Sequence, residues 1–96
     1  MTAPRPVPVL LAGPPRLAQL DLPGDDTRLV RRHLALVAAL AEGRLTPGEF
    51  RRQAAKLPAI SGGQRLVDDP VTALALVEQA RAADIDLTFA DPGEDT

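Results

Sequence analysis

One short corner between two helical segments constrains the fold more than any other feature of the sequence. Gly43 is typical of the left-handed residue that follows a helix, and Thr46 is typical of the residue that caps the next helix. Pro47 suits the first helical position, and Glu49 can complete a capping box with Thr46. Because the turn at Gly43–Leu45 is so short, we expect the two helices to form a hairpin.

The sequence predicts three helices around this corner. The first begins near Asp25–Thr27 and ends at Glu42, and its apolar stripe at helical spacing consists of Leu29, His33, Leu36, Val37 and Leu40, widened by Val30, Leu34 and Ala41. The second ends before Pro58 and buries Phe50, Ala54 and Leu57. The third has Asp69 as its cap and Pro70 at its first position, with an apolar face formed by Ala73, Leu74, Leu76, Val77, Ala80 and Ala83.

The two ends of the chain carry weaker signals. Five prolines fall within residues 1–15, which favours a flexible leader. Alternate residues of Val7–Leu11 are apolar, so a short strand restricted to a sheet edge is the alternative. Ile85–Phe89 shows the same alternation, and a strand there would pair with Val7–Leu11 or with a second copy of the chain.

These signals together predict an all-α fold, a small three-helix domain built on a helical hairpin. Residues 1–24 are expected to be a Pro-rich, partly disordered leader. Residues 25–90 are expected to form the helical domain, with a short strand near its end as an open alternative, and residues 91–96 form an acidic tail.

Length and composition set further limits. A chain of 96 residues makes at most one domain, and such a small core favours a homodimer. The absence of cysteine excludes disulfides, thiolate nucleophiles and cysteine metal sites. The apolar run Val9–Ala12 is too short for a signal peptide or a transmembrane span, so we expect a cytoplasmic protein.

The corner also carries a pattern of leucine, glycine, aliphatic residue, threonine, glutamate, phenylalanine, lysine and leucine. The residues in question are Leu40, Gly43, Leu45, Thr46, Glu49, Phe50, Lys56 and Leu57. This pattern resembles the SHOCT module, a short helical hairpin of bacterial proteins, although Pro47-Gly48 and Ala54 depart from its usual acidic and lysine residues. The resemblance covers about a fifth of the chain. It implies a packing or oligomerisation element and no catalytic residue.

No set of residues predicts catalysis, a cofactor or a metal ion. His33 is the only histidine, and its place on the apolar stripe favours a packed residue with one hydrogen bond satisfied. Asp68-Asp69 and Asp84/Asp86 are carboxylate pairs without a nucleophile or second base beside them in the sequence. The loop Ile60–Arg65 resembles the signature loop of ABC-transporter ATPases, but the chain has no phosphate loop of the GxxxxGK[ST] type. We therefore expect a protein that is not an enzyme.

Charge is divided unevenly along the chain. From Arg28 to Arg65 there are eight basic and two acidic residues, whereas from Asp68 to Thr96 there are eight acidic residues and one basic residue. The first turns of the first helix hold three of the basic residues, where the helix dipole disfavours cations. The hairpin is thus predicted to present a basic surface formed by Arg28, Arg31, Arg32, Arg44, Arg51, Arg52 and Lys56.

Three partners could neutralise this surface: an acidic protein, duplex DNA or the chain's own acidic tail. The sequence lacks the aromatic residues used for stacking on single-stranded nucleic acid. Our leading hypothesis is a small adaptor, accessory or regulatory protein that binds a partner protein through the seven cations. The alternative is a DNA-binding regulator or antitoxin-like protein whose basic hairpin contacts duplex phosphates.

Overall fold

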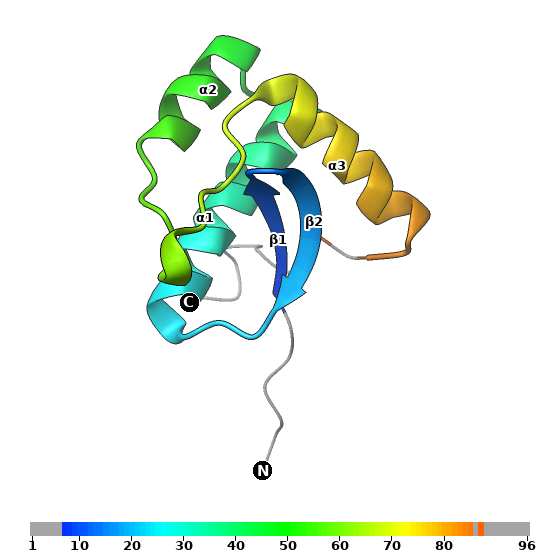
Figure 1. The fold of residues 1–96 in the computed structure, drawn as a ribbon. Coiled ribbons are helices and arrows are strands. Elements are labelled where there is room, and N and C mark those ends of the chain that lie inside the picture. The colour runs from blue at the N-terminus through cyan, green and yellow to red at the C-terminus, as the bar shows by residue number, and fades with distance from the viewer. Residues whose placement is uncertain (1–6, 86, 88–96) are drawn as a thin grey trace, which may run out of the picture.

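A computed structural model, which describes residues 7–85 and 87, shows a two-stranded hairpin packed against three helices (Figure 1). The strands are β1 (Val7–Ala12) and β2 (Pro15–Leu20). The helices are α1 (Gly24–Ala41), α2 (Pro47–Ala55) and α3 (Pro70–Ala82), with a short 3-10 turn at Ser61–Gly63. The fold is therefore α+β, and the prediction of an all-α domain with a flexible Pro-rich N-terminus is wrong.

The prolines that favoured a flexible leader lie at positions of the β1–β2 sheet where no hydrogen bond between the strands needs their backbone nitrogen. β1 and β2 pair antiparallel, with Pro8 opposite Gln19 and Ala12 opposite Pro15. Ala12 directs its N–H away from β2, toward the Arg65 carbonyl at 2.9 Å. Because backbone groups alternate in direction along a strand, the nitrogen of Pro8 also faces away from β2, and that of Pro15 faces away from β1. Neither proline removes a hydrogen bond between the strands.

The second edge of β1 is covered by the segment 65–67, which joins the Ser61–Gly63 turn to α3. The Val67 N–H donates to the Leu10 carbonyl at 3.0 Å, and Leu11 and Leu66 form an isolated antiparallel bridge. β1 thus lies between β2 and this segment. This position explains why β1 is buried on both faces, whereas β2 is partly exposed.

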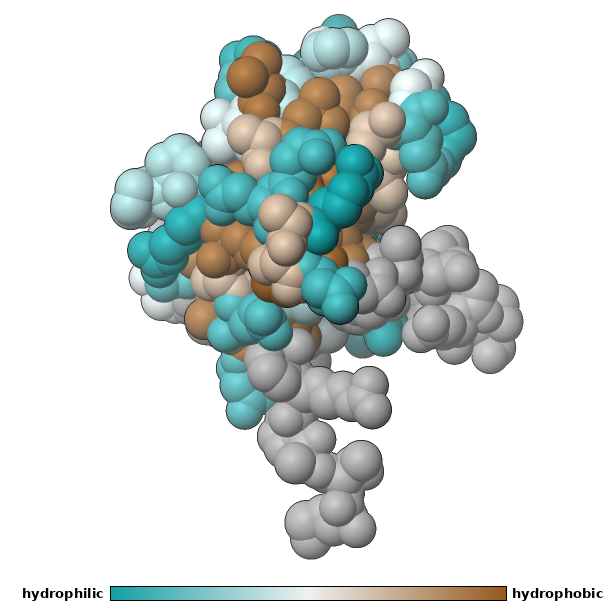
Figure 2. Space-filling view, turned by 90° about the vertical axis from the view of Figure 1, so that its right-hand side faces the viewer, coloured by the Kyte–Doolittle hydropathy of each residue, from teal (hydrophilic) through white to brown (hydrophobic). Residues whose placement is uncertain are grey.

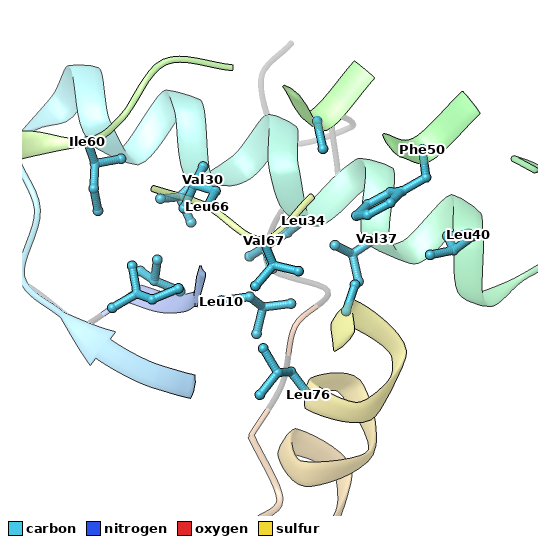
Figure 3. Close-up of a cluster of buried hydrophobic side chains, with 14 of the residues drawn as sticks. Leu10, Val30, Leu34, Val37, Leu40, Phe50, Ile60, Leu66, Val67 and Leu76 are labelled. Carbon is cyan, nitrogen blue, oxygen red and sulfur yellow. The ribbon is translucent and has the colours of Figure 1, made fainter. Parts of the chain in front are cut away.

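The core is assembled from every element that surrounds α1 (Figure 3). α1 contacts β1, α2 and α3, and α3 also contacts β2. Side chains from β1, α1, the segment 65–67 and α3 meet in one cluster, which includes Leu10, Leu34, Val37, Val67 and Leu76. Phe50 reaches this cluster from α2 and is fully buried.

The helix ends follow the predicted capping chemistry. Gly43 has a φ of +79° and follows α1, and the N–H groups of Gly43 and Arg44 donate to Leu40 and Ala39 at 3.2 and 2.9 Å. Thr46 and Glu49 form the complete capping box of α2, and Asp69 caps α3. The helical hairpin predicted from this corner is confirmed.

Two other predictions need comment. α1 begins at Gly24, with Pro23 at the cap position, so no side chain caps it. In the predicted strand Ile85–Phe89, the two described residues, Ile85 and Leu87, are not in a strand. Residues 86, 88 and 89 lie outside the described residues. The predicted acidic tail, residues 91–96, also lies outside them.

The surface over α3 is mixed in character. Figure 2 views the side of the molecule on which α3 lies and shows hydrophobic surface between hydrophilic side chains. On α3 itself, Val71 is 75% exposed and Leu74 is 38% exposed. The homodimer that was predicted from the small size of the core stays a prediction. Among the described residues, none of the helices is both long and apolar enough to span a bilayer.

Candidate partner-binding groove

The structure does not gather all seven predicted cations into one surface. Arg44 pairs with Glu42, Nη2 to Oε1 at 2.6 Å, and Arg51 pairs with Asp69, Nη2 to Oδ1 at 3.3 Å. Both pairs are well exposed, so each contributes little to stability. These two cations nevertheless have carboxylate partners within the chain and are less available to a ligand than an exposed cation without such a partner.

The three arginines of α1 have different surroundings. Arg31 is half-buried and engaged in an interaction of its own, whereas Arg28 and Arg32 are exposed. Because α1 begins at Gly24, these arginines lie beyond its first turn, where the effect of the helix dipole has largely faded. The helix dipole therefore does not disfavour these arginines in the structure.

Three of the seven cations line one groove between α1 and α2. Arg32 comes from α1, Arg52 from α2, and Lys56 is the C-cap residue of α2. The groove has a volume of about 470 Å³, and its other lining residues are Leu29, Leu36, Glu49, Gln53, Leu57 and Pro58. Among the described residues, none of the three cations forms an ion pair.

The floor of this groove is made by aliphatic residues that the sequence pattern assigned to the core. Leu29, Leu36 and Leu57 are only partly buried, whereas Val30, on the inner side of α1, is fully buried. The apolar stripe of α1 is wider than the surface that α2 can cover, because α2 has only 9 residues. The remainder of the stripe is left facing the groove. The sequence contained this signal in the width of the stripe, but helical periodicity alone does not say which side is uncovered.

The capping box fixes the one acidic residue of the groove. The Thr46 N–H and hydroxyl both lie 3.1 Å from Oε1 of Glu49. Hydrogen bonds from the Thr46 backbone and side chain lower the pKa of Glu49, and the charge of Arg52 lowers it further. Glu49 is therefore a carboxylate held at the start of α2, and it leaves the groove with an excess of positive charge.

His33 is a structural residue, as its place on the apolar stripe predicted. Its side chain is fully buried in α1, with Nε2 2.6 Å from the Val67 carbonyl. Because a carbonyl oxygen only accepts, Nε2–H is the donor in this bond. In the neutral ring Nδ1 is then unprotonated, and it has no hydrogen-bond partner. Burial lowers the pKa of His33, while the bond to Val67 and the charge of Asp68 raise it by less. His33 connects α1 to the segment 65–67.

The loop Ile60–Arg65 also has a structural explanation. The Ile60 N–H donates to the Gln64 carbonyl at 2.9 Å, which closes the loop and holds the Ile60 side chain in the core. Gly62 and Gly63 have φ values of +85° and +76°, a conformation that other residues rarely adopt. The glycines that resemble a nucleotide-contacting sequence are therefore required by a tight turn.

A second hollow, of about 590 Å³, lies between α1 and α3 and holds none of the seven predicted cations. Its walls are mainly aliphatic and include Val37, Ala41, Val77 and Ile85. Within residues 7–85 and 87, no three side chains of the histidine, cysteine, aspartate and glutamate types are grouped closely enough to hold a metal ion.

Comparisons with protein-family models, curated proteins and solved structures find no match to this chain. The SHOCT resemblance of Leu40–Leu57 stays a prediction, although the segment does form a helical hairpin. The α1–α2 groove, with its apolar floor and three cations, is the feature whose chemistry most directly indicates a ligand.

Proposed function

We propose that the protein is a non-catalytic adaptor or regulatory protein that binds a partner protein in the α1–α2 groove. The observation that carries this proposal is the grouping of Arg32, Arg52 and Lys56 beside partly buried leucines. Arginine is enriched at protein interfaces, and aliphatic side chains grouped without a full covering are a feature of interaction sites.

The composition of the groove supports binding rather than catalysis. Its lining contains one carboxylate, Glu49, which is engaged by Thr46 in the helix cap. General acid–base catalysis needs a group free to exchange a proton with a substrate, and nucleophilic catalysis needs an activated nucleophile. Among the groove's lining residues, the side chains are instead cationic, amide or aliphatic.

The proposal is tested by co-purification from the native cell with identification of bound proteins by mass spectrometry. The bait proteins are the wild type, the double variant Arg32→Glu/Arg52→Glu, and the control Arg16→Glu. Arg16 is an exposed arginine of β2 outside the groove, and it has no ion pair among the described residues. We expect a partner that is retained by the control and lost with the double variant. Equal retention by all three baits would exclude the groove.

Duplex DNA remains the second candidate, because Arg28 and Arg32 on α1 and Arg52 on α2 are all exposed. Contacts to several phosphates require affinity to fall steeply as salt rises. Titration of a 30-base-pair duplex at about 50 and 200 mM salt tests this reading, since a protein with six or more phosphate contacts loses roughly a thousandfold in affinity over that range. Absence of binding at the lower salt concentration would remove the DNA hypothesis.

A further inference from the structure

We infer that the occupant of the α1–α2 groove is a short acidic amphipathic segment of the partner protein. This inference rests on the proposed function and specifies the chemistry of the partner. It follows from two properties of the groove that select different features of a ligand: the aliphatic floor and the cations beside it.

The floor sets the length and the apolar content of the segment. On α1 the groove extends from Leu29 to Leu36, seven residues or about 10 Å along the helix axis. Leu57 continues the apolar floor on the α2 side. A ligand that covers this floor needs two or three aliphatic side chains within about two helical turns, as in other cases where a peptide lies in a groove between helices.

The cations set the sign of the charge. Arg32 is contributed by one helix, and Arg52 and Lys56 are contributed by the other. A ligand in the groove therefore meets positive charge from both helices, and carboxylates beside its apolar residues would pair with these groups. Such complementarity favours a faster association and excludes basic partners.

The other occupants fit less well. The chain's own segment 91–96 supplies Asp91, Glu94 and Asp95, but Pro92 is its one apolar side chain. Leu87, the last described residue before this segment, lines the hollow between α1 and α3 and not the α1–α2 groove. DNA supplies phosphates, but it leaves the apolar floor without a complementary surface, and the Glu49 carboxylate lies in the same groove. An acidic peptide with aliphatic residues matches both properties.

The probe is a phage-displayed library of random 12-residue peptides, selected on the full-length protein after depletion on the Arg32→Glu/Arg52→Glu variant. We expect the enriched peptides to carry a net negative charge and at least two aliphatic residues. Enrichment of basic or uncharged peptides, or no enrichment, would overturn the inference.

The most enriched peptide is then measured by fluorescence anisotropy. We expect the double variant to weaken binding at least tenfold, Leu36→Ser to weaken it several-fold, and the control Arg16→Glu to change it less than twofold. Circular dichroism of each variant confirms that the helices are retained. A peptide whose affinity is unchanged by Leu36→Ser or by replacing its own aliphatic residues with alanine binds by charge alone, and this contradicts the inference.

Two further measurements separate the possible failures. If Asp91→Asn/Glu94→Gln/Asp95→Asn raises peptide affinity tenfold or more, the chain's own acidic segment occupies the groove, and the inference is wrong. If the peptides fail while co-purification still yields a partner that depends on Arg32 and Arg52, the chemistry assigned to the partner is wrong but the proposed function stands. Loss of both results removes the function as well.

Discussion

At the scale of single residues, His33 is the most deeply buried polar side chain among the described residues. It is fully buried, it donates to the Val67 carbonyl, and its ring centre lies 6.2 Å from that of Phe50. Protonation would place a charge and an unpaired N–H in the core, because Nδ1 has no partner. Among the described residues, Asp68 is the titratable group whose charge raises the pKa of His33, and its effect is smaller than that of burial.

This arrangement predicts a loss of stability in mild acid. The pKa of His33 is lowered in the folded protein, so the unfolded chain binds a proton first as the pH falls through 6.5. The free energy of unfolding should be constant near pH 7.5 and fall below pH 6.5, by up to about 1.4 kcal/mol per pH unit. Urea denaturation of the wild type and of His33→Gln at pH 7.5 and 5.5 measures this difference, which the variant should not show.

The two carboxylates with a lowered pKa do not contribute to the change in stability between pH 7.5 and 5.5. Hydrogen bonds from Thr46 and Thr72 lower the pKa values of Glu49 and Asp69 below their usual 4.5 and 3.8. Stability from these groups is present above those values and is lost only at lower pH. An equal fall between pH 7.5 and 5.5 in the wild type and in His33→Gln would show that His33 is not the group responsible.

Phe50 provides a second prediction at this scale. It is the largest fully buried side chain, and it joins α2 to the shared core. Phe50→Ala should reduce the free energy of unfolding by about 3–5 kcal/mol, because truncation leaves a cavity as well as removing apolar contacts. Chemical denaturation measures the loss. A change within experimental error would show that the corner between α1 and α2 is peripheral to the core.

At the scale of elements, two glycines near the corner make opposite predictions. Gly43 has a φ of +79°, whereas Gly48 lies within α2 and has no such constraint, and a Cβ at either position would meet open space. Gly43→Ala should therefore destabilise the protein by roughly 1–2 kcal/mol through the backbone alone. Gly48→Ala should stabilise it by about 0.4–1 kcal/mol, because alanine restricts the unfolded chain. Thermal unfolding of both variants measures these effects, and a shift of the same sign would contradict the proposed origin.

The elements also show what the sequence could predict. Helix ends at Gly43, Thr46 and Asp69 were predictable because capping depends on residues close together in the chain. The β1–β2 hairpin was not predictable in this way. Proline is excluded from a strand only at positions where the backbone N–H is needed for a hydrogen bond. Whether Pro8 meets that condition depends on the register with β2 and on the distant segment 65–67, and neither is visible in local sequence.

At the scale of the whole molecule, the β1–β2 hairpin and the three helices share one core. Leu10 in β1 is fully buried among residues of α1 and α3. Leu10→Ala should therefore cost about 2–5 kcal/mol and lower the midpoint of helix unfolding followed by circular dichroism. The control Gln19→Ala, at an exposed position of β2, should stay within about 0.5 kcal/mol. An unchanged helical transition in Leu10→Ala would mean that the hairpin is not part of the folding unit.

The candidate site was only partly predictable at this scale. The sequence identified seven cations, but it could not show that Arg44 and Arg51 pair with carboxylates or that three others share a groove. Ion pairs such as Arg51–Asp69 join residues from different helices, so they depend on the packing of α2 against α3. The groove itself depends on how far α2 covers α1, which is a property of the folded structure.

The covering of β1 by the segment 65–67 has a consequence for biosynthesis. β1 is made early, but the residues that occupy its second edge are added about 55 positions later. At 5–20 residues per second, this interval lasts about 3–11 s. During translation the second edge of β1 therefore stays unpaired until residues 65–67 of the nascent chain have been made. We expect this stage, rather than the mature fold, to be when the protein most needs the help of a chaperone.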